Sequence, residues 1–303
     1  MAATANKVPA QAHAYNESEA VHLLTYMAAA YCKTELMAHP VWPSNCSICR
    51  EEPNFVMTGR FEGEYATFGF VGYDADADYI ILSFEGSHNW ENWILDGKYW
   101  TTAYPGIPGA YVHRGFYYGY QSVRSEIRKA LGYLMGNHTG APLFVVGHSL
   151  GAALGAVAAL DLTLDPVSND TEVLLYTMGA PRVFNEKLAD LAMGLIKTRY
   201  HITHNADIVT HLPPLSIPEG EWGWDYFQYY HHMGTEVWYP QNDMIFGKSK
   251  YIVCDGGGED YNCSDSLEPY QYSVSDHLKY FQVPISQSCN LPTLDRPTNA
   301  GER

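Results

Sequence analysis

Residues Pro142 to Leu162 read PLFVVGHSLGAALGAVAALDL, and this stretch decides the fold. It begins with a short apolar run at 143–146, which predicts a strand that is buried on both faces. The remainder, rich in Ala and Leu, predicts a helix whose small side chains allow close packing against a sheet. Only a very tight turn fits between the two elements. Gly147 and Gly151 remove the Cβ atoms that would clash in such a turn.

Ser149 lies at the centre of this turn, within a G-x-S-x-G pattern. A strained turn from strand to helix is typical of a nucleophile elbow, which holds the serine Oγ at the N-terminus of the helix. The helix dipole and the N–H groups there favour the negative charge that develops during acyl transfer. The pattern also occurs by chance in glycine-rich loops. A buried strand before it and an unbroken helix after it favour the catalytic interpretation.

The composition indicates one large globular domain. Of the 303 residues, 46% are hydrophobic and 17% are charged, so a sizeable core is available. Because α/β folds of this size are often single, we expect one domain over residues 1–303. No apolar run approaches the roughly 20 residues of a membrane-spanning helix. The net charge of −16 argues against nucleic acid as a partner and against electrostatic attraction to anionic lipid.

The cysteines and the glycosylation sequons point to secretion. Six cysteines permit three disulfides without fixing which residues pair. Cys46 and Cys49 lie in a loop of Pro, Ser and Asn, which favours a local disulfide over a zinc or redox site. N-x-S/T sequons begin at Asn16, Asn45, Asn137, Asn169 and Asn262. Together these features indicate a secreted, extracellular glycoprotein. Residues 1–15 lack the apolar core of a signal peptide, so we expect Met1 to begin a mature form.

Predicted helices and strands alternate along the chain. Apolar residues at helical spacing predict helices over 17–37, 114–135 and 185–197, the first with Asn16 as its N-cap. Short apolar runs predict strands over 54–60, 65–73, 79–84, 173–177, 199–203, 237–239 and 251–253. The alternation predicts an α/β fold in which helices flank a central, mostly parallel sheet and sites lie at the carboxyl ends of strands.

Two polar stretches interrupt this pattern. Alternating aspartates at 74–78 predict a solvated hairpin turn rather than a calcium site, because no Gly or distal Glu completes a binding loop. In the stretch EGSHNWENWILD at 85–96, Trp90, Trp93 and Ile94 share one helical face. Such a helix is either a buried flap, which the pattern alone favours, or an amphipathic lid that enters a lipid interface.

A serine nucleophile needs a general base, and the base needs a carboxylate to orient it. In chains with an elbow of this type the order is serine, acid, histidine. Asp207 follows a predicted strand and therefore suits a loop at the active end of the sheet. Five further candidate carboxylates that follow Ser149 lie in less ordered stretches: Asp225, Asp243, Asp255, Asp260 and Asp265.

Four histidines follow Asp207, namely His211, His231, His232 and His277. His277 comes last, at the start of a short apolar helix pattern, and suits a terminal loop that folds back over the site. His231 and His232 could ligate a metal, but no third ligand is evident, so a structural role is favoured. His148, beside the nucleophile, is expected to serve in packing.

At this point the chain resembles the fungal-type class 3 lipases, within the α/β-hydrolases. The resemblance covers roughly residues 15–290 and rests on the motifs FEGSHNWENW at 84–93, VVGHSLGAALG at 145–155, MGAPRVFN at 178–185, HNADIVTHLPP at 204–214, HHMGTEVWY at 231–239 and SDHLKYF at 275–281.

The resemblance implies that Ser149 is the nucleophile, Asp207 the orienting acid and His277 the base. It implies an oxyanion hole made by Ser87, through its hydroxyl and backbone N–H, and by the backbone N–H of Leu150. It further implies a lid helix that includes Trp90, Trp93, Ile94 and Leu95. The cysteines match the three-bridge version of the family, with pairs Cys32–Cys289, Cys46–Cys49 and Cys254–Cys263.

Two residues depart from the family pattern. Glu85 stands where the family usually has Arg, beside the oxyanion serine, and this inverts a charge near the lid hinge. Ala152 replaces the second Gly that usually follows the nucleophile, outside the G-x-S-x-G core.

We therefore expect a carboxylic ester hydrolase, a triacylglycerol lipase that acts as a monomer on lipid esters at an interface, without metal or cofactor. Within enzymes the rivals are a phospholipase A1 or galactolipase and a feruloyl-type esterase. A non-catalytic binding module on this fold predicts a degraded site, whereas all three triad candidates are present. A metal-dependent hydrolase using His231 and His232 is a further alternative.

Overall fold

The computed structural model describes residues 13–39, 41–88, 99–164, 171–219, 226–254 and 257–290. The expected lid residues Trp90, Trp93, Ile94 and Leu95 lie outside these ranges, as do residues 291–303. The helices are α1 (Glu17–Ala30), α2 (Lys33–Ala38), α4 (Arg114–Asn137), α5 (Leu150–Thr163), α6 (Glu186–Leu195) and α7 (Val274–His277). Short 3-10 turns are η1 (Ile48–Glu51), η3 (Ile208–His211), η4 (Ser264–Ser266), η5 (Pro269–Gln271) and η6 (Ile285–Asn290).

The main sheet has eight strands in the order β1-β2-β3-β6-β7-β8-β11-β12. Their bounds are β1 (Phe55–Glu62), β2 (Phe68–Asp74), β3 (Tyr79–Phe84), β6 (Leu143–His148), β7 (Val173–Met178), β8 (Thr198–His204), β11 (Thr235–Tyr239) and β12 (Ile252–Val253). Strands β3, β6, β7, β8 and β11 pair in parallel, and antiparallel strands flank them at both edges. The predicted α/β fold with a mostly parallel sheet is confirmed.

Three small antiparallel pairs accompany the main sheet. They join β4 (Thr101–Ala103) to β5 (Tyr111–His113), β9 (Ser216–Glu219) to β10 (Tyr226–Tyr229), and β13 (Lys279–Tyr280) to β14 (Val283–Pro284). The sequence pattern predicted none of these strands. Pairs this short carry too few alternating residues to be recognised.

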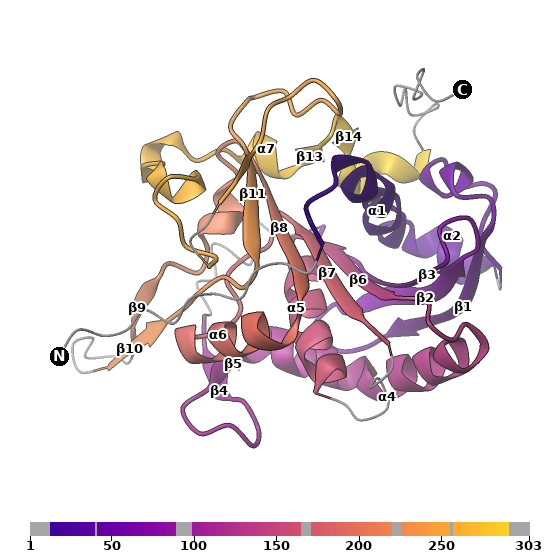
Figure 1. Ribbon diagram of the computed structural model, residues 1–303, viewed down its shortest axis with the longest axis horizontal. Helices are drawn as coiled ribbons and strands as arrows, with labels where there is room; N and C mark the ends of the chain where they lie inside the picture. Colours follow the sequence, from indigo (N-terminus) through magenta and orange to yellow (C-terminus); the bar gives the residue numbers. More distant parts are fainter. Residues whose placement is uncertain are drawn as a thin grey trace.

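Helices cover both faces of the main sheet (Figure 1). Strand β6 shows how one strand serves two cores, because successive side chains point to opposite faces. Leu143 and Val145 pack in the core that also contains residues of α4, α5 and α6. Phe144 and Val146 pack in the core formed with α1 and the C-terminal segment. Both faces of β6 are therefore buried, as its continuous apolar run predicts.

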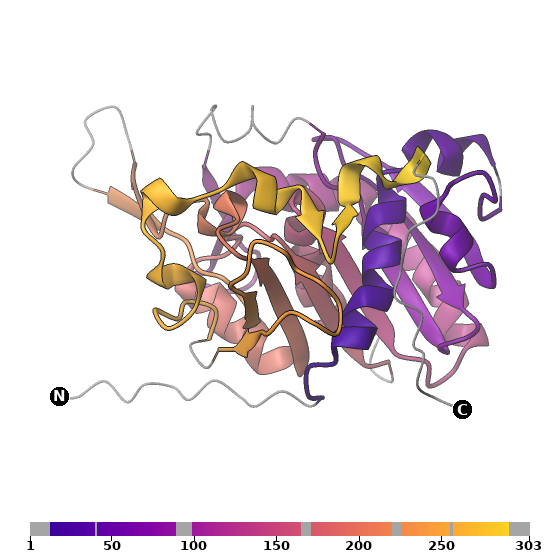
Figure 2. The same ribbon diagram turned by 90° about the horizontal axis from the view of Figure 1, so that it is seen from above.

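The N-terminal helix ends earlier than its apolar pattern predicts. Asn16 caps α1 through its side-chain oxygen, as expected, but the helix stops at Ala30 and a separate α2 begins at Lys33. Between them Tyr31 takes the C-cap position, and Cys32 forms a disulfide with Cys289. The C-terminal segment from α7 to η6 passes along one edge of the molecule towards α1 and α2 (Figure 2).

The aspartate-rich turn at 74–78 is a turn between β2 and β3, as predicted, but it is not fully solvated. Asp74 is buried, and its Oδ1 accepts hydrogen bonds from the backbone N–H groups of Asp76 and Ala77. Its other oxygen accepts from His22 and Tyr26 on α1. The carboxylate of Asp74 therefore helps to hold α1 on the sheet.

Candidate active site

Ser149 lies in a strained turn between β6 and α5. It is a non-glycine residue with a positive φ of 58°, and its backbone N–H donates to the carbonyl of Met178 at 3.1 Å. A Cβ atom at Gly147 would lie 2.3 Å from the backbone of Gly151, and one at Gly151 would lie 2.3 Å from the carbonyl oxygen of Phe84. Only glycine fits at these two positions, so the turn has the tight geometry that the sequence predicts.

Three residues distant in the chain meet at this turn. The Nε2 atom of His277 lies 2.9 Å from Ser149 Oγ, and its Nδ1 atom lies 2.9 Å and 3.0 Å from the two carboxylate oxygens of Asp207. Ser149, Asp207 and His277 are at most 2% exposed. The imidazole thus bridges hydroxyl and carboxylate in a buried environment.

Backbone pairing between two loops brings His277 over Asp207. Asp207 follows β8, and His277 is the last residue of the short helix α7, rather than its first as the sequence pattern suggests. The N–H of Ser273 donates to the carbonyl of Ala206 at 2.7 Å, and the N–H of Ile208 donates to the carbonyl of Ser273 at 3.2 Å. These bonds align the start of α7 with the loop that carries the carboxylate.

Asp207 is held in its ionised form. Burial alone would raise the pKa of this carboxyl, but the positive charge and hydrogen bond of His277, together with the hydroxyl of Tyr280 and the N–H of Val209, lower it to about 2. Tyr280 donates to Oδ2 at 2.6 Å and Val209 to Oδ1 at 2.8 Å. Because an ionised carboxylate only accepts, His277 Nδ1 carries the proton that faces it. Nε2 is then free to accept the proton of Ser149.

Gly179 is a site residue that the sequence analysis did not single out, although it lies in the MGAPRVFN motif. Its φ is +57°, and a Cβ atom there would lie 2.7 Å from Asp207 Oδ2 and 3.0 Å from His277 Nδ1. A side chain at this position would therefore separate the acid from the base. The only signal in the sequence is a glycine directly after a predicted strand, which is a weak one.

Ser87 and Leu150, the residues expected to bind an oxyanion, line the same pocket as Ser149. The pocket has a volume of about 450 Å³. Leu150 is the first residue of α5, where backbone N–H groups have no carbonyl partner within the helix. Most of the remaining lining residues are apolar or aromatic: Tyr65, Ala66, Trp100, His113, Arg114, Gly115, Phe116, Leu154, Pro181 and Val209. Ser149 thus opens onto a largely apolar cavity at the N-terminus of α5.

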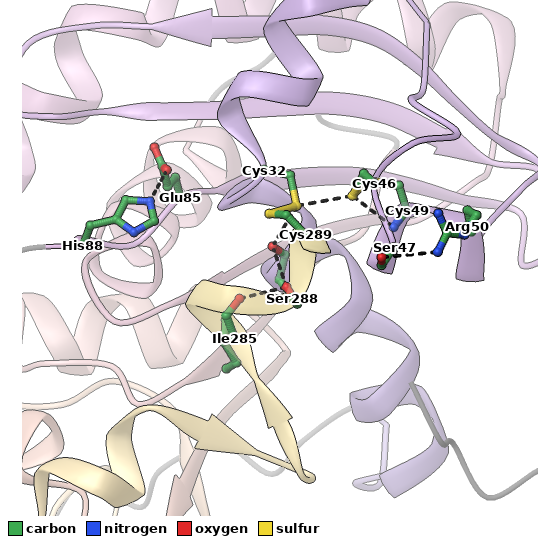
Figure 3. The surroundings of a disulfide bond; sticks show 11 residues. Cys32, Cys46, Ser47, Cys49, Arg50, Glu85, His88, Ile285, Ser288 and Cys289 are labelled. Carbon is green, nitrogen blue, oxygen red and sulfur yellow. Dashed lines mark hydrogen bonds and ion pairs between the residues drawn. A yellow bond between two sulfur atoms is a disulfide. The ribbon is translucent and has the colours of Figure 1, made fainter. Parts of the chain in front are cut away.

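Glu85, which departs from the family pattern, is buried and lies two residues before Ser87 in the sequence. Burial raises the pKa of its carboxyl, and the positive charge of His88 opposes the shift. His88 Nε2 lies 3.2 Å from Glu85 Oε1, and the two side chains point toward one another (Figure 3). The carboxyl group of Glu85 therefore has the imidazole of His88 as its partner, three residues further along the same loop.

The other candidate acids and bases within the described ranges make different contacts. His232 Nε2 lies 2.6 Å from the carbonyl oxygen of Thr210, and its ring stacks on His201. His211 stacks on Tyr272. Asp265 pairs with Arg182 at 3.1 Å, and Asp260 accepts from Asn262. These contacts are those of structural residues. Asp225 and Asp255 lie outside the described ranges.

His148 was expected to serve in packing, and it is buried, but it also makes two hydrogen bonds. Its Nε2 atom lies 2.9 Å from the carbonyl oxygen of His277, and its Nδ1 atom lies 2.8 Å from the hydroxyl of Tyr31. From the sequence Tyr31 was predicted only as an apolar position of the helix over 17–37, because an aromatic residue near the end of an apolar helix carries no catalytic signal.

The structure contains the three disulfides that the family resemblance implies: Cys32–Cys289, Cys46–Cys49 and Cys254–Cys263. The sulfur of Cys46 lies 3.2 Å from that of Cys32, so the first two bridges are in contact (Figure 3). The local pair at 46 and 49 was also favoured from the sequence alone. Together the Cys32–Cys289 and Cys46–Cys49 bridges hold the end of α1, the loop after α2 and η6 close to one another.

Known proteins resemble this chain over most of its length. The family model described as "Lipase (class 3)" matches residues 81–217. A lipase of Rhizomucor miehei is 28% identical over 268 residues, and the match covers 88% of this chain and 69% of that protein. The match covers only 61% of the length of lipases from Rhizopus niveus and Rhizopus oryzae.

A shorter relative matches over more of its own length. The secreted mono- and diacylglycerol lipase A of Penicillium cyclopium is 30% identical over 279 residues, which are 88% of this chain and 85% of that protein. Among solved structures, the triacylglyceride lipase of Rhizomucor miehei superposes with a TM-score of 0.77 at 28% identity, covering 92% of this chain and 98% of that one.

Proposed function

The chain belongs to the fungal-type class 3 lipases, and on that premise we propose that it hydrolyses acylglycerol esters through Ser149, His277 and Asp207. One observation carries the proposal. The hydroxyl of Ser149 lies within hydrogen-bond distance of an imidazole whose opposite nitrogen faces an ionised carboxylate. This is the arrangement that an activated serine nucleophile requires.

The reaction has two halves. Ser149 Oγ attacks the ester carbonyl carbon while His277 Nε2 accepts the hydroxyl proton, and the N–H of Leu150 with the N–H and hydroxyl of Ser87 stabilise the oxyanion. The intermediate collapses when the bond to the alcohol breaks and His277 returns its proton to that oxygen. A water molecule, deprotonated by His277, then attacks the acyl carbon and forms a second tetrahedral intermediate. The bond between Ser149 Oγ and the acyl carbon breaks, and His277 returns the proton to Oγ. The fatty acid is released and the serine hydroxyl is restored.

Several features support a lipid ester as the substrate. The pocket beside Ser149 is lined mainly by apolar and aromatic side chains, which suits an acyl chain. The relatives are named as lipases and as mono- and diacylglycerol lipases. None of the helices in the described ranges combines the length and the apolar character needed to cross a bilayer. From the apolar pocket and from these relatives, we infer that the enzyme meets its substrate at a lipid–water interface.

The proposal extends to the location, the domain organisation and the oligomeric state of the protein. Three disulfides and relatives described as secreted support an extracellular location. One continuous eight-stranded sheet together with the Cys32–Cys289 bridge supports a single domain over residues 1–303. We propose that this domain acts as a monomer.

Replacing the nucleophile tests the proposal. Ser149→Ala should fold normally, and its kcat should be roughly ten-thousandfold or more below that of the wild type, because the triad cannot act without its serine. A fluorophosphonate probe should label the wild type and fail to label this variant. A matched control is Ser83→Ala, which removes another buried hydroxyl, one that donates to the carbonyl of Tyr26. The control should be labelled and active. Unchanged turnover in Ser149→Ala would refute the assignment.

A substrate panel separates the acylglycerol proposal from its rivals. Triolein emulsion, mono- and diacylglycerol, phosphatidylcholine liposomes and methyl ferulate would be compared at equal enzyme concentration. We expect hydrolysis of the acylglycerols to dominate. Faster release of fatty acid from the phospholipid would indicate a phospholipase instead. Activity on a partly soluble ester should rise sharply above its solubility limit, and strictly hyperbolic kinetics would contradict action at an interface.

A further inference from the structure

We propose that Tyr31 and His148 act as a pair of positioning residues that hold the base His277 and the oxyanion loop in their working geometry. We call residues 85–88, which include Ser87, the oxyanion loop. The proposal rests on the proposed function, since it assigns supporting roles within that reaction. Neither residue of the pair lines the pocket, so neither is expected to touch the substrate.

His148 anchors the main chain of the base. A backbone carbonyl only accepts hydrogen bonds, so His148 Nε2, 2.9 Å from the carbonyl oxygen of His277, must carry a proton. The two imidazoles also stack, with ring centroids 4.6 Å apart and an interplanar angle of 27°. The bond and the stacking together fix both the backbone and the ring plane of His277.

Tyr31 fixes the tautomer of His148. Because Nε2 of the neutral ring carries the proton, Nδ1 is an acceptor, and the Tyr31 hydroxyl donates to it at 2.8 Å. Burial and the positive charge of His277 lower the pKa of His148 to about 3. His148 therefore stays neutral while His277 gains and loses its proton, and it does not compete as a base.

Tyr31 also supports the oxyanion loop. A Cβ atom at Gly86 would lie 1.8 Å from the Tyr31 hydroxyl oxygen and 2.7 Å from the carbonyl oxygen of His148, so the loop backbone packs directly against the pair. The ring of His88 meets the ring of Tyr31 edge-on at 5.3 Å. Tyr31, at the end of α1, therefore contacts both His148 and the oxyanion loop, through Gly86 before Ser87 and His88 after it.

The expected consequence is a loss of rate without a loss of binding. A shift of the imidazole or of the oxyanion donors by a fraction of an ångström weakens interactions made only in the transition state. Tyr31→Phe should therefore lower kcat on a soluble p-nitrophenyl ester roughly tenfold, with KM within about twofold of the wild type. The rate of Ser149 labelling by a fluorophosphonate should fall in parallel.

Two substitutions of His148 separate positioning from packing. His148→Leu removes the donor to His277 and should lower kcat at least as much as Tyr31→Phe. His148→Gln keeps an amide N–H at the position of Nε2 and should recover most of the lost rate. A merely structural role would not distinguish the two by kcat at unchanged KM.

Tyr26→Phe is the matched control. Tyr26 is also a buried tyrosine, within α1, but its hydroxyl donates to Asp74 at 2.8 Å and not to a residue of the candidate site. It should cost stability but leave kcat unchanged. The proposal is overturned if Tyr31→Phe and His148→Leu, when folded, both match the control in kcat and labelling rate. An inactive wild type would instead count against the proposed function, while the labelling rates would still report on positioning.

Discussion

Two regions of this molecule place a histidine against a buried aspartate. In the candidate active site His277 lies 2.9 Å from Asp207. On the other side of the molecule, between α1 and the turn after β2, His22 lies 2.6 Å from Asp74. In each region a tyrosine hydroxyl donates to the same aspartate, from Tyr280 at 2.6 Å or Tyr26 at 2.8 Å.

The two regions differ in what faces the second ring nitrogen. His277 faces the hydroxyl of Ser149, whereas His22 faces a second carboxylate, that of Glu52 at 3.2 Å. Burial alone would lower the pKa of His22, but its hydrogen bonds with Asp74 and Glu52 raise it to about 9. A histidine held between two carboxylates keeps its proton. A histidine between one carboxylate and a neutral hydroxyl can give its proton up and take it back, as a general base must.

The strongest test of this comparison replaces each aspartate by asparagine. Asp207→Asn should lower kcat about 10⁴-fold, because the amide no longer fixes the tautomer of His277 or stabilises its protonated form. Asp74→Asn should leave kcat within roughly twofold and reduce the free energy of unfolding, since it removes a charged acceptor from His22 and Tyr26. Kinetics and urea unfolding on both variants check this. A similar loss of kcat in both would remove the distinction between the regions.

A second test measures how the stability depends on pH. The pKa of His22 is raised from 6.5 to about 9 in the folded protein. The protonated form therefore stabilises the fold fully below about pH 6.5, and this contribution is lost as the pH rises through about 9. Its size should be on the order of 1–3 kcal/mol.

His22→Gln is the variant that isolates this contribution. Compared with the wild type, its urea midpoint should change less between pH 6 and pH 9.5, while its kcat stays the same. If wild type and variant lose stability in parallel over this range, His22 is not held as a cation.

The smallest expected effect concerns the two tyrosines. Tyr280→Phe removes a hydroxyl that donates to the acid of the triad, so kcat should fall by roughly three- to tenfold, the cost of one hydrogen bond. Tyr26→Phe removes the corresponding hydroxyl in the other region and should leave kcat unchanged. Thermal unfolding should show similar losses of stability for both. Equal kcat values would mean that the hydroxyl of Tyr280 serves folding alone.

How far the sequence predicts the site depends on how local each feature is. The elbow at Ser149 was predicted because strand, glycines and helix occupy one continuous stretch. From the residues alone Asp207 and His277 were the favoured candidates among several, and the family resemblance then selected them. Their pairing depends on backbone bonds between Ala206 and Ser273, residues far apart in the chain. No periodicity within a short stretch reports such a contact.

The same reasoning explains the differences in the fold. The central strands were predicted because long apolar runs mark them. The break in the first helix at Tyr31 was not predicted, because it follows from the disulfide of Cys32 with Cys289 and from the contacts of Tyr31 with residues on other elements. Asp74 was expected to be solvated because its partners, His22 and Tyr26, are supplied by a different helix.

The Cys32–Cys289 bridge joins residues 257 positions apart. It closes most of the backbone into a covalent ring, and Ser149, Asp207 and His277 all lie inside that ring. A protease that cuts one peptide bond between residues 32 and 289 therefore cannot free either fragment while the bridge is oxidised. Ser149, Asp207 and His277 therefore stay tethered in one molecule after such a nick, although the backbone between them has been cut.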